Sequence, residues 1–487
     1  MFMIRDGAVA HRFSLSQALV ALAALLCLGG CGGPKLSPWH TVQLTSEFSV
    51  DHTPDIDSFE DYLRLEDAVF TQLDQLLYDH TDTGPKHALE RYSRGSLADP
   101  GQHPQNWNRS FELASEAPVG GVLLLHGMSD SPYSLRAIGE TLQQRGFQVL
   151  GLRMPGHGTA PSGLASVSWQ DMSAVVRLGM MHLGQRVGDK PIHIIGYSTG
   201  AALALDFALQ VEQGTAKPAP ASLVLISPAI GLSPAAVLAK WGRRLSRLPG
   251  LGGLAWLDVA PEFDPYKYNS FATNAAEQVH SLTSSVASRI AARGNAADPL
   301  PPMLVLKSTV DATVSNDAVV DRLMLQLSPR RHEMVLFDIN RFAAIASLLV
   351  DNPRPFTERM IADEQLPFGL TLVANADTNS RAVNAYHKSP FSAGASHVEA
   401  LEKTWPEGVF SLSHVALPFP PGDRLYGSTP PADRNQLFLG QQALQGERGV
   451  LIIPGNFLLR LRHNPFYGYL ESRVRRWVEN PGSSRFN

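Results

Sequence analysis

The chain has 487 residues, of which 44% are hydrophobic and 18% are charged, and its formal net charge is −4. This composition is that of a globular chain with a sizeable core, and it excludes an intrinsically disordered protein. The basic residues are scattered along the sequence, so we do not expect nucleic acid as a partner. The length allows two or three domains, or one α/β domain that carries insertions.

The first 30 residues have the pattern of a signal peptide. Arg5 and Arg12 precede the apolar run 18–28, which is the length of a signal-peptide core and short for a membrane span. The run ends in Leu28-Gly29-Gly30-Cys31, which resembles the bacterial lipoprotein box. The resemblance implies that Cys31 is lipidated and becomes the first residue of the mature chain. The alternative is an ordinary secretory signal cleaved nearby.

Lipidation would place the protein in the bacterial cell envelope. By resemblance to sorting rules, Gly32 after the cysteine favours the outer membrane, with the protein facing the periplasm. The only cysteines are Cys27 and Cys31, so cleavage before Cys31 leaves no pair for a disulfide.

Residues 31–115 form an expected N-terminal extension. Apolar residues at three- and four-residue spacing predict an amphipathic helix over 58–80. A loop rich in Gly, Pro, Asn and Ser follows at about 94–106, and 107–113 is a candidate strand.

From residue 116 onward, short apolar runs alternate with helical stretches. Helices are predicted over 133–145, 169–183 and 199–210, and strands over 121–125, 148–153, 191–196, 222–227 and 303–308. This alternation predicts a doubly wound, mostly parallel α/β sheet in a domain covering 116–487. Two segments interrupt the rhythm: about 230–298, a candidate cap over the site, and about 341–407, which holds a strand-like stretch at 370–374.

The central motif is Gly196-Tyr197-Ser198-Thr199-Gly200. An apolar strand leads into it and an alanine- and leucine-rich helix leads out. That context predicts a nucleophile elbow, a sharp turn that exposes the Ser198 hydroxyl and needs Gly196 and Gly200 because side chains there would clash. A second motif, His126-Gly127-Met128, follows the strand 121–125. We expect Gly127 to allow a close backbone approach and the amides of Met128 and Thr199 to form an oxyanion hole.

The motifs at 126–127, 153–158 (Arg-Met-Pro-Gly-His-Gly) and 196–200 stand in the order found in the α/β-hydrolase superfamily. The chain resembles in particular its branch of monoacylglycerol lipases, carboxylesterases and serine aminopeptidases, mainly over residues 120–314. The resemblance implies a serine hydrolase with a Ser-Asp-His triad, no cofactor and no metal. It also implies that His157 is a structural loop histidine.

The triad acid and base must follow Ser198 in the chain. Asp311, in a turn after the strand 303–308, is the expected acid, with Asp338 and Asp377 as alternatives. His414, in a short loop after the second insertion, is the expected base. His387 and His397 are the alternatives, because no histidine follows the strand-like residues 334–337 closely.

The residue pattern predicts a hydrolase that forms an acyl-enzyme on Ser198, and the resemblance implies that its substrate is an acyl ester, lipid-like or otherwise hydrophobic. One alternative is an amidase or aminopeptidase, in which Asp258, Glu262 and Asp264 would hold a substrate ammonium. Another is a lipid-anchored envelope protein on an inactive hydrolase scaffold. Near the C-terminus, the stretch 458–469 is rich in arginine and aromatic residues and is expected to be a packed helix with a solvated basic face. The alternative is that Arg460, Arg462, Tyr467 and Tyr469 meet a membrane surface or a substrate.

Overall fold

The fold is seen in a computed structural model of the chain. It describes residues 35–51, 55–231, 252–293, 300–311, 313–329, 331–342, 348–350, 352–433, 435–440 and 455–482. The predicted signal peptide, Cys31 and the parts 232–251 and 294–299 of the candidate cap lie outside the described residues.

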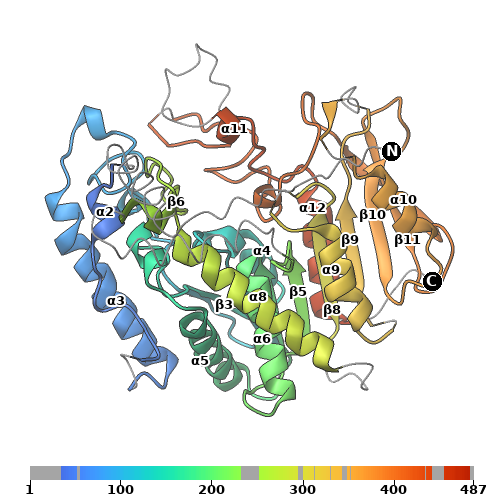
Figure 1. Cartoon of the computed structure of the whole chain (residues 1–487), viewed down its shortest axis with the longest axis horizontal. Helices are drawn as coiled ribbons and strands as arrows, with labels where there is room; N and C mark the ends of the chain where they lie inside the picture. Colours follow the sequence, from blue (N-terminus) through green and yellow to red (C-terminus); the bar gives the residue numbers. More distant parts are fainter. Residues whose placement is uncertain are drawn as a thin grey trace, which may run out of the picture.

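A ten-stranded sheet forms the centre of the molecule (Figure 1), in the order β1-β3-β2-β4-β5-β8-β9-β10-β11-β12. Strands β3 to β10 in that order are parallel, whereas β1, β11 and β12 pair antiparallel at the two edges. Their bounds are β1 Phe111–Leu113, β2 Gly120–Leu125, β3 Phe147–Leu152, β4 Ile192–Tyr197, β5 Ser222–Ile226, β8 Met303–Ser308, β9 Glu333–Phe337, β10 Gly369–Asn375, β11 Ala382–Lys388 and β12 His397–Thr404.

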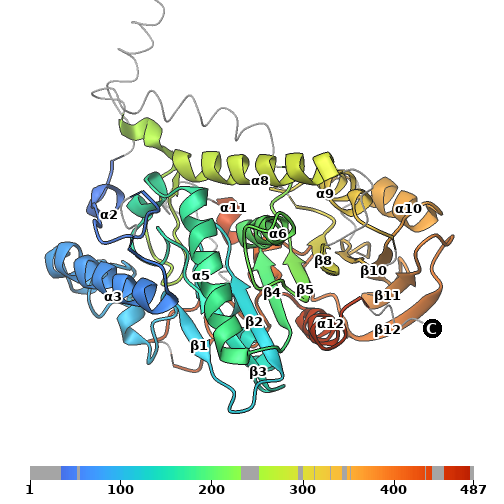
Figure 2. The same ribbon diagram turned by 90° about the horizontal axis from the view of Figure 1, so that it is seen from below.

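Helices cover both faces of the sheet (Figure 2), as expected for continuous apolar strands that are buried on both sides. One face packs against α5 (Trp169–Val187), α6 (Thr199–Glu212), α8 (Thr273–Arg293), α9 (Asn316–Arg322) and α10 (Arg354–Ala362). The other packs against α4 (Arg136–Gln143) and α12 (Tyr467–Glu479). The side chains of β2 alternate between these layers, since Leu123 and Leu125 join the first core and Val122 and Leu124 the second.

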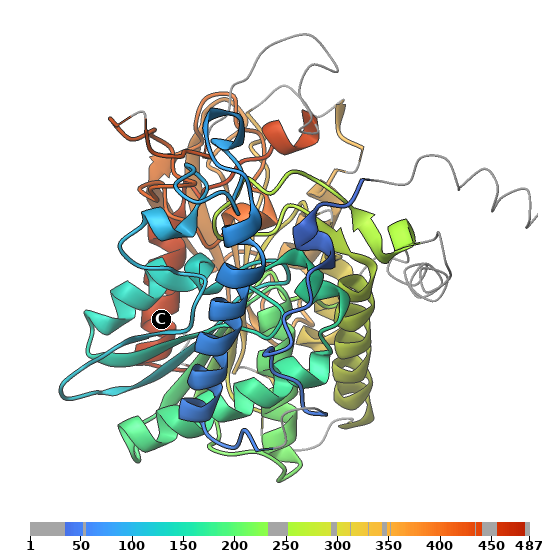
Figure 3. The ribbon, with the colours of Figure 1, turned by 90° about the vertical axis from the view of Figure 1, so that its left-hand side faces the viewer.

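The N-terminal extension packs on the outside of this sandwich (Figure 3). Its long helix α3 (Phe59–Leu76) begins at Ser58, which caps the amide of Asp61, and it lies against α5. Helix α2 (Pro38–Thr41) contacts the small antiparallel pair β6 (Trp256–Asp258) and β7 (Phe271–Ala272) through a hydrogen bond of 2.9 Å between His40 and Ser270.

The two interrupting segments take different forms. In the described part of 230–298, α8 is the crossover helix between β5 and β8 and packs against α6. The alternation of strands and helices therefore continues through this segment. The segment 341–407 extends the sheet, because it contributes α10 and the strands β10, β11 and β12. The short α11 (Gly455–Leu458) and α12 end the described chain, so the expected helix over 458–469 is wrong in position. Within the described residues, no helix combines the length and apolar character needed to cross a bilayer.

Candidate active site

The strand order reverses at the carboxyl ends of β2 and β4. From β2 the chain moves outward to β3 on one side and then returns to β4 on the other. In sheets of this kind, ligands bind where the strand order reverses. The two motifs expected to carry the chemistry, His126-Gly127 after β2 and Ser198 after β4, both lie at this point.

Ser198 sits on a strained turn between β4 and α6. Its backbone has φ 54° and ψ −113°, a conformation that an L-residue rarely adopts. The turn requires glycine on both sides. A Cβ at Gly196 would lie 2.5 Å from the Ala201 backbone, and one at Gly200 would lie 2.0 Å from the carbonyl oxygen of Leu125. These approaches bring the start of α6 against the end of β2.

The loop after β2 lies directly beside the serine. A Cβ at Gly127 would come within 3.2 Å of the Cβ of Ser198. Within the described part of the chain, neither the amide of Met128 nor that of Thr199 donates a hydrogen bond. Thr199 opens α6, so its N–H adds the positive end of the helix dipole. Two unsatisfied donors beside a serine hydroxyl are what an oxyanion hole requires.

His126 and His157 have structural roles. The amide of Met154 donates to Nε2 of His126 at 3.1 Å, so the proton lies on Nδ1 and bonds the carbonyl of Gly127 at 2.9 Å. Burial holds the pKa of His126 well below its usual range and lowers that of His157 to about 4. Both rings are neutral, and His126 ties the loop after β2 to the turn after β3.

His414 and Asp311 meet, although they lie far apart in the sequence. Nδ1 of His414 is 3.4 Å from Oδ1 of Asp311, and both side chains are nearly buried. Burial acts to raise the pKa of Asp311, but the nearby Lys307 and His414 outweigh it and hold this pKa below its usual value. Asp311 is therefore a carboxylate that can orient the imidazole. Burial lowers the pKa of His414 to about 4, so His414 is a neutral base at physiological pH.

Lys307 holds the carboxylate from the other side. Its Nζ donates to Oδ2 of Asp311 at 2.7 Å and to the carbonyl of Val314 at 2.8 Å, and its side chain is fully buried. Oδ1 of Asp311 also accepts from the amides of Thr313 and Val314, at 2.9 and 3.2 Å. Lys307 is not predicted from the sequence as a site residue, although it lies at the end of β8, four residues before Asp311.

Part of the chain is similar in sequence to known hydrolases. Residues 116–338 match the family model described as "Serine aminopeptidase, S33". The chain has the fold and sequence pattern of an α/β hydrolase. A thermostable monoacylglycerol lipase from Bacillus sp. is 36% identical over 95 residues, which cover 20% of this chain and 37% of that protein. The match thus spans well under half of that relative.

Two solved structures are similar to part of the chain. A metagenome-derived lipolytic enzyme shares 20% identity over 47% of this chain and 87% of that chain, with a TM-score of 0.39. The monoacylglycerol lipase of Paleococcus ferrophilus shares 19% identity over 47% of this chain and 88% of that chain, with a TM-score of 0.37.

The alternative triad residues have other partners in the hydrolase domain. Asp338 accepts from Arg341 at 2.6 Å, and Asp377 caps an exposed turn by accepting from the amide of Asn379. His387 lies on β11, where it bonds Thr371 at 3.0 Å and stacks on His397 at the sheet edge. Among these candidates, only Asp311 and His414 contact each other as an acid and base must.

The acids proposed to hold a substrate ammonium are largely engaged. Glu262 is buried and accepts from the amides of Asn269 and Ser270, at 2.9 and 2.8 Å. Asp264 is fully buried and accepts from the hydroxyl of Tyr426 at 2.6 and 2.7 Å. Both carboxylates stabilise the segment 260–270. In this segment the amide of Tyr268 donates to the carbonyl of Ser129, in the loop after β2. Of the three acids, only Asp258 is exposed.

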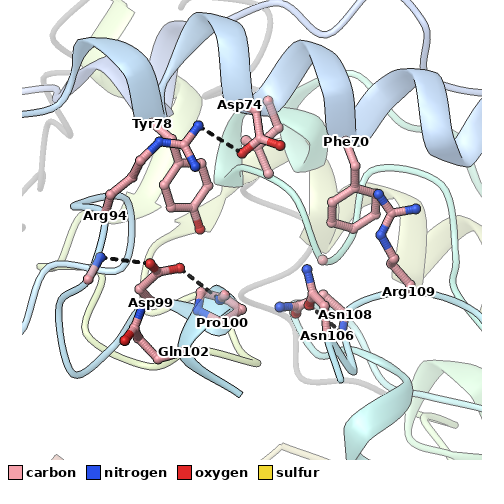
Figure 4. A pocket seen from close by; sticks show the side chains of 14 residues that line it. Phe70, Asp74, Tyr78, Arg94, Asp99, Pro100, Gln102, Asn106, Asn108 and Arg109 are labelled. Atoms are coloured by element: carbon pink, nitrogen blue, oxygen red, sulfur yellow. Dashed lines mark hydrogen bonds and ion pairs between the residues drawn. The ribbon is translucent and has the colours of Figure 1, made fainter. Parts of the chain in front are cut away.

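A pocket of about 370 Å³ lies beside α3, between the helix and the loop 94–109 (Figure 4). Its charged side chains are paired within its wall, since Arg94 bonds Asp74 and Asp99 accepts from two backbone amides. None of the predicted triad residues lines it. In the described residues, no group of His, Cys, Asp and Glu side chains is arranged to hold a metal ion.

Proposed function

We propose that the chain is a serine hydrolase that cleaves a carboxylic ester with a hydrophobic acyl group through an acyl-enzyme on Ser198. The observation that carries the proposal is the strained turn at Ser198, with glycines on both sides that no other residue could replace. A binding protein has no need of such strain, whereas a nucleophile must be exposed to its substrate and to its base.

The proposed steps use groups described above. His414 accepts the hydroxyl proton as Ser198 Oγ attacks the carbonyl carbon, and Asp311 holds the imidazole in the tautomer with its proton on Nδ1. The amides of Met128 and Thr199 receive the negative charge that develops on the carbonyl oxygen. The alcohol leaves with the proton from His414. Water, activated by the same histidine, then releases the acid and restores Ser198.

Two observations favour an ester over an aminoacyl amide. The similarity to a monoacylglycerol lipase supports an acyl ester. An aminopeptidase needs a carboxylate free to hold the substrate ammonium, and Glu262 and Asp264 are committed to backbone and tyrosine donors.

The test is hydrolysis of p-nitrophenyl esters of increasing acyl length, together with labelling by a fluorophosphonate probe. We expect Ser198→Ala and His414→Ala to lower kcat by about 10⁴-fold or more, and Asp311→Asn by about 10⁴-fold. The matched controls His397→Ala and Asp377→Asn should keep the activity. Labelling without ester turnover would point to another substrate class, and absence of labelling at Ser198 would refute the catalytic proposal.

We further propose that Cys31 is lipidated and attaches the protein to the bacterial envelope, in the outer membrane facing the periplasm. The support is the cysteine directly after the apolar run. Cells expressing the chain should incorporate labelled palmitate into it, and Cys31→Ser should abolish the label. Label retained in Cys31→Ser would refute the proposal.

A further inference from the structure

Arg460 lies beside the proposed catalytic base in the segment between α11 and α12. Its Nε donates to the hydroxyl of Ser413 at 2.9 Å, and one of its terminal nitrogens is 3.1 Å from Nδ1 of His414. The residue is exposed to solvent. Within the described part of the chain, no carboxylate forms an ion pair with it.

This contact conflicts with the proposed mechanism. A neutral imidazole nitrogen either carries a proton and donates or accepts through its lone pair. Arg460 can only donate, so its bond to Nδ1 puts the imidazole proton on Nε2, where it blocks proton transfer from Ser198. The carboxylate that the base needs lies farther from Nδ1 than Arg460 does: Oδ1 of Asp311 is 3.4 Å away, and the Arg460 nitrogen is 3.1 Å away. Arg460 and Asp311 thus compete for one atom.

The charges around His414 single out Arg460. Three cations face the imidazole: Lys307, which pairs with Asp311 at 2.7 Å; Lys267, which lies 3.7 Å from Asp130; and Arg460. Only Arg460 lacks a carboxylate of its own. A guanidinium in that position is suited to bind a carboxylate or phosphate, which it can hold with two parallel hydrogen bonds.

We propose that Arg460 binds an anionic group, a carboxylate or phosphate, carried by the substrate close to the scissile ester, and that this binding releases Nδ1 of His414 to Asp311. Arg460 is then both a specificity residue and a positioning residue. The proposal rests on the hydrolase function proposed above and narrows its substrates to anionic esters. Without an anion, His414 is held in the wrong tautomer and neutral esters react slowly.

The experiment uses the full chain in detergent and esters matched in shape. p-Nitrophenyl valerate is compared with mono-p-nitrophenyl glutarate, in which a carboxylate replaces the terminal methyl of the acyl chain. Phenyl butyrate is compared with 4-butyryloxybenzoate and 4-butyryloxyphenyl phosphate, which carry the anion on the leaving group. The variants are Arg460→Gln, Arg460→Lys and the control Arg354→Gln, an exposed arginine on α10.

We expect at least one anionic ester to exceed its neutral partner in kcat/KM by about tenfold or more, the usual range for a charged hydrogen bond. Arg460→Gln should reduce this ratio by about tenfold and raise kcat on the neutral ester, because Nδ1 is freed. Arg460→Lys should keep part of the ratio, and Arg354→Gln all of it. The acid limb of kcat/KM on the neutral ester should move to higher pH in Arg460→Gln, since a cation beside His414 is lost.

Two results would overturn the proposal: equal kcat/KM for all charged and neutral pairs, or a ratio unchanged in Arg460→Gln. Either result refutes only the proposal for Arg460. The hydrolase function still holds if neutral esters are cleaved and Ser198→Ala abolishes that cleavage. Failure of the function itself appears differently, as no turnover of any ester and no fluorophosphonate label on Ser198.

Discussion

Replacing Lys307 by methionine should destabilise the chain by about 3–5 kcal/mol, the range for breaking a buried ion pair from one side. Methionine fills a similar volume but leaves Oδ2 of Asp311 without its partner at 2.7 Å. At an effective dielectric constant of about 20, the lost attraction is about 6 kcal/mol, and part of it is offset because the ammonium no longer has to be desolvated. Asp311 keeps the two backbone donors on Oδ1 and the His414 imidazole at 3.4 Å, but Oδ2 has no cation left beside it.

The measurement is equilibrium urea unfolding followed by tryptophan fluorescence, on Lys307→Met, Asp311→Leu and the double variant. Each single variant leaves one buried charge alone, whereas the double variant leaves none. The double variant should therefore lose less stability than the sum of the singles, with a coupling energy of about 2 kcal/mol or more. Additive losses would show that Lys307 and Asp311 do not stabilise each other, and would refute the conclusion that Lys307 keeps Asp311 ionised.

Three further predictions concern the same region. Gly200→Ala should abolish esterase activity and lower the unfolding midpoint, because its Cβ would lie 2.0 Å from the carbonyl of Leu125; an active, stable variant would contradict the elbow. Because burial lowers the pKa of His414 to about 4, kcat/KM should persist as the pH falls below 6.5 and be lost only as it falls through about 4. A pH–rate profile with its acid limb at 6.5 or above would refute this. Tyr426→Phe should cost about 1.5–3 kcal/mol in urea unfolding, since the buried Asp264 carboxylate loses its hydroxyl donor; a loss below about 0.5 kcal/mol would be evidence against that bond.

The sequence predicted the central sheet and the elbow because both have local causes. Strands buried on two faces are continuous apolar runs, as in 120–125 and 192–197, and the crossover helices between them are long. The glycines around Ser198 are required by contacts with the turn and with the end of β2, so their spacing is visible in the chain. The predicted bounds of β2, β3, β4, β5 and β8 are accordingly within one residue of those observed, whereas the edge strand β1 begins four residues after the start of the candidate strand 107–113.

The rest depends on contacts between distant segments. Strand β12 is exposed along most of its length and carries four charged or ionisable residues among its first seven, so it has no apolar pattern from which a strand could be predicted. The stretch 458–469 predicts a basic helix face that includes Arg460, yet Arg460 contacts His414, 46 residues earlier in the chain. The sequence of this stretch does not indicate which arginine contacts a histidine, because that contact depends on the path of the segment between α11 and α12.

The anchoring of α2 has a consequence for how far the enzyme could stand from a membrane. Trp39 is buried against Tyr92, and His40 is fixed to Ser270 beside β6. If Cys31 carries the lipid, only eight peptide steps separate the lipid from Trp39, and a fully extended chain of that length spans roughly 28 Å. The tether would therefore be shorter than the body it holds, and the surface beside α2 and β6 would stay close to the bilayer in every orientation.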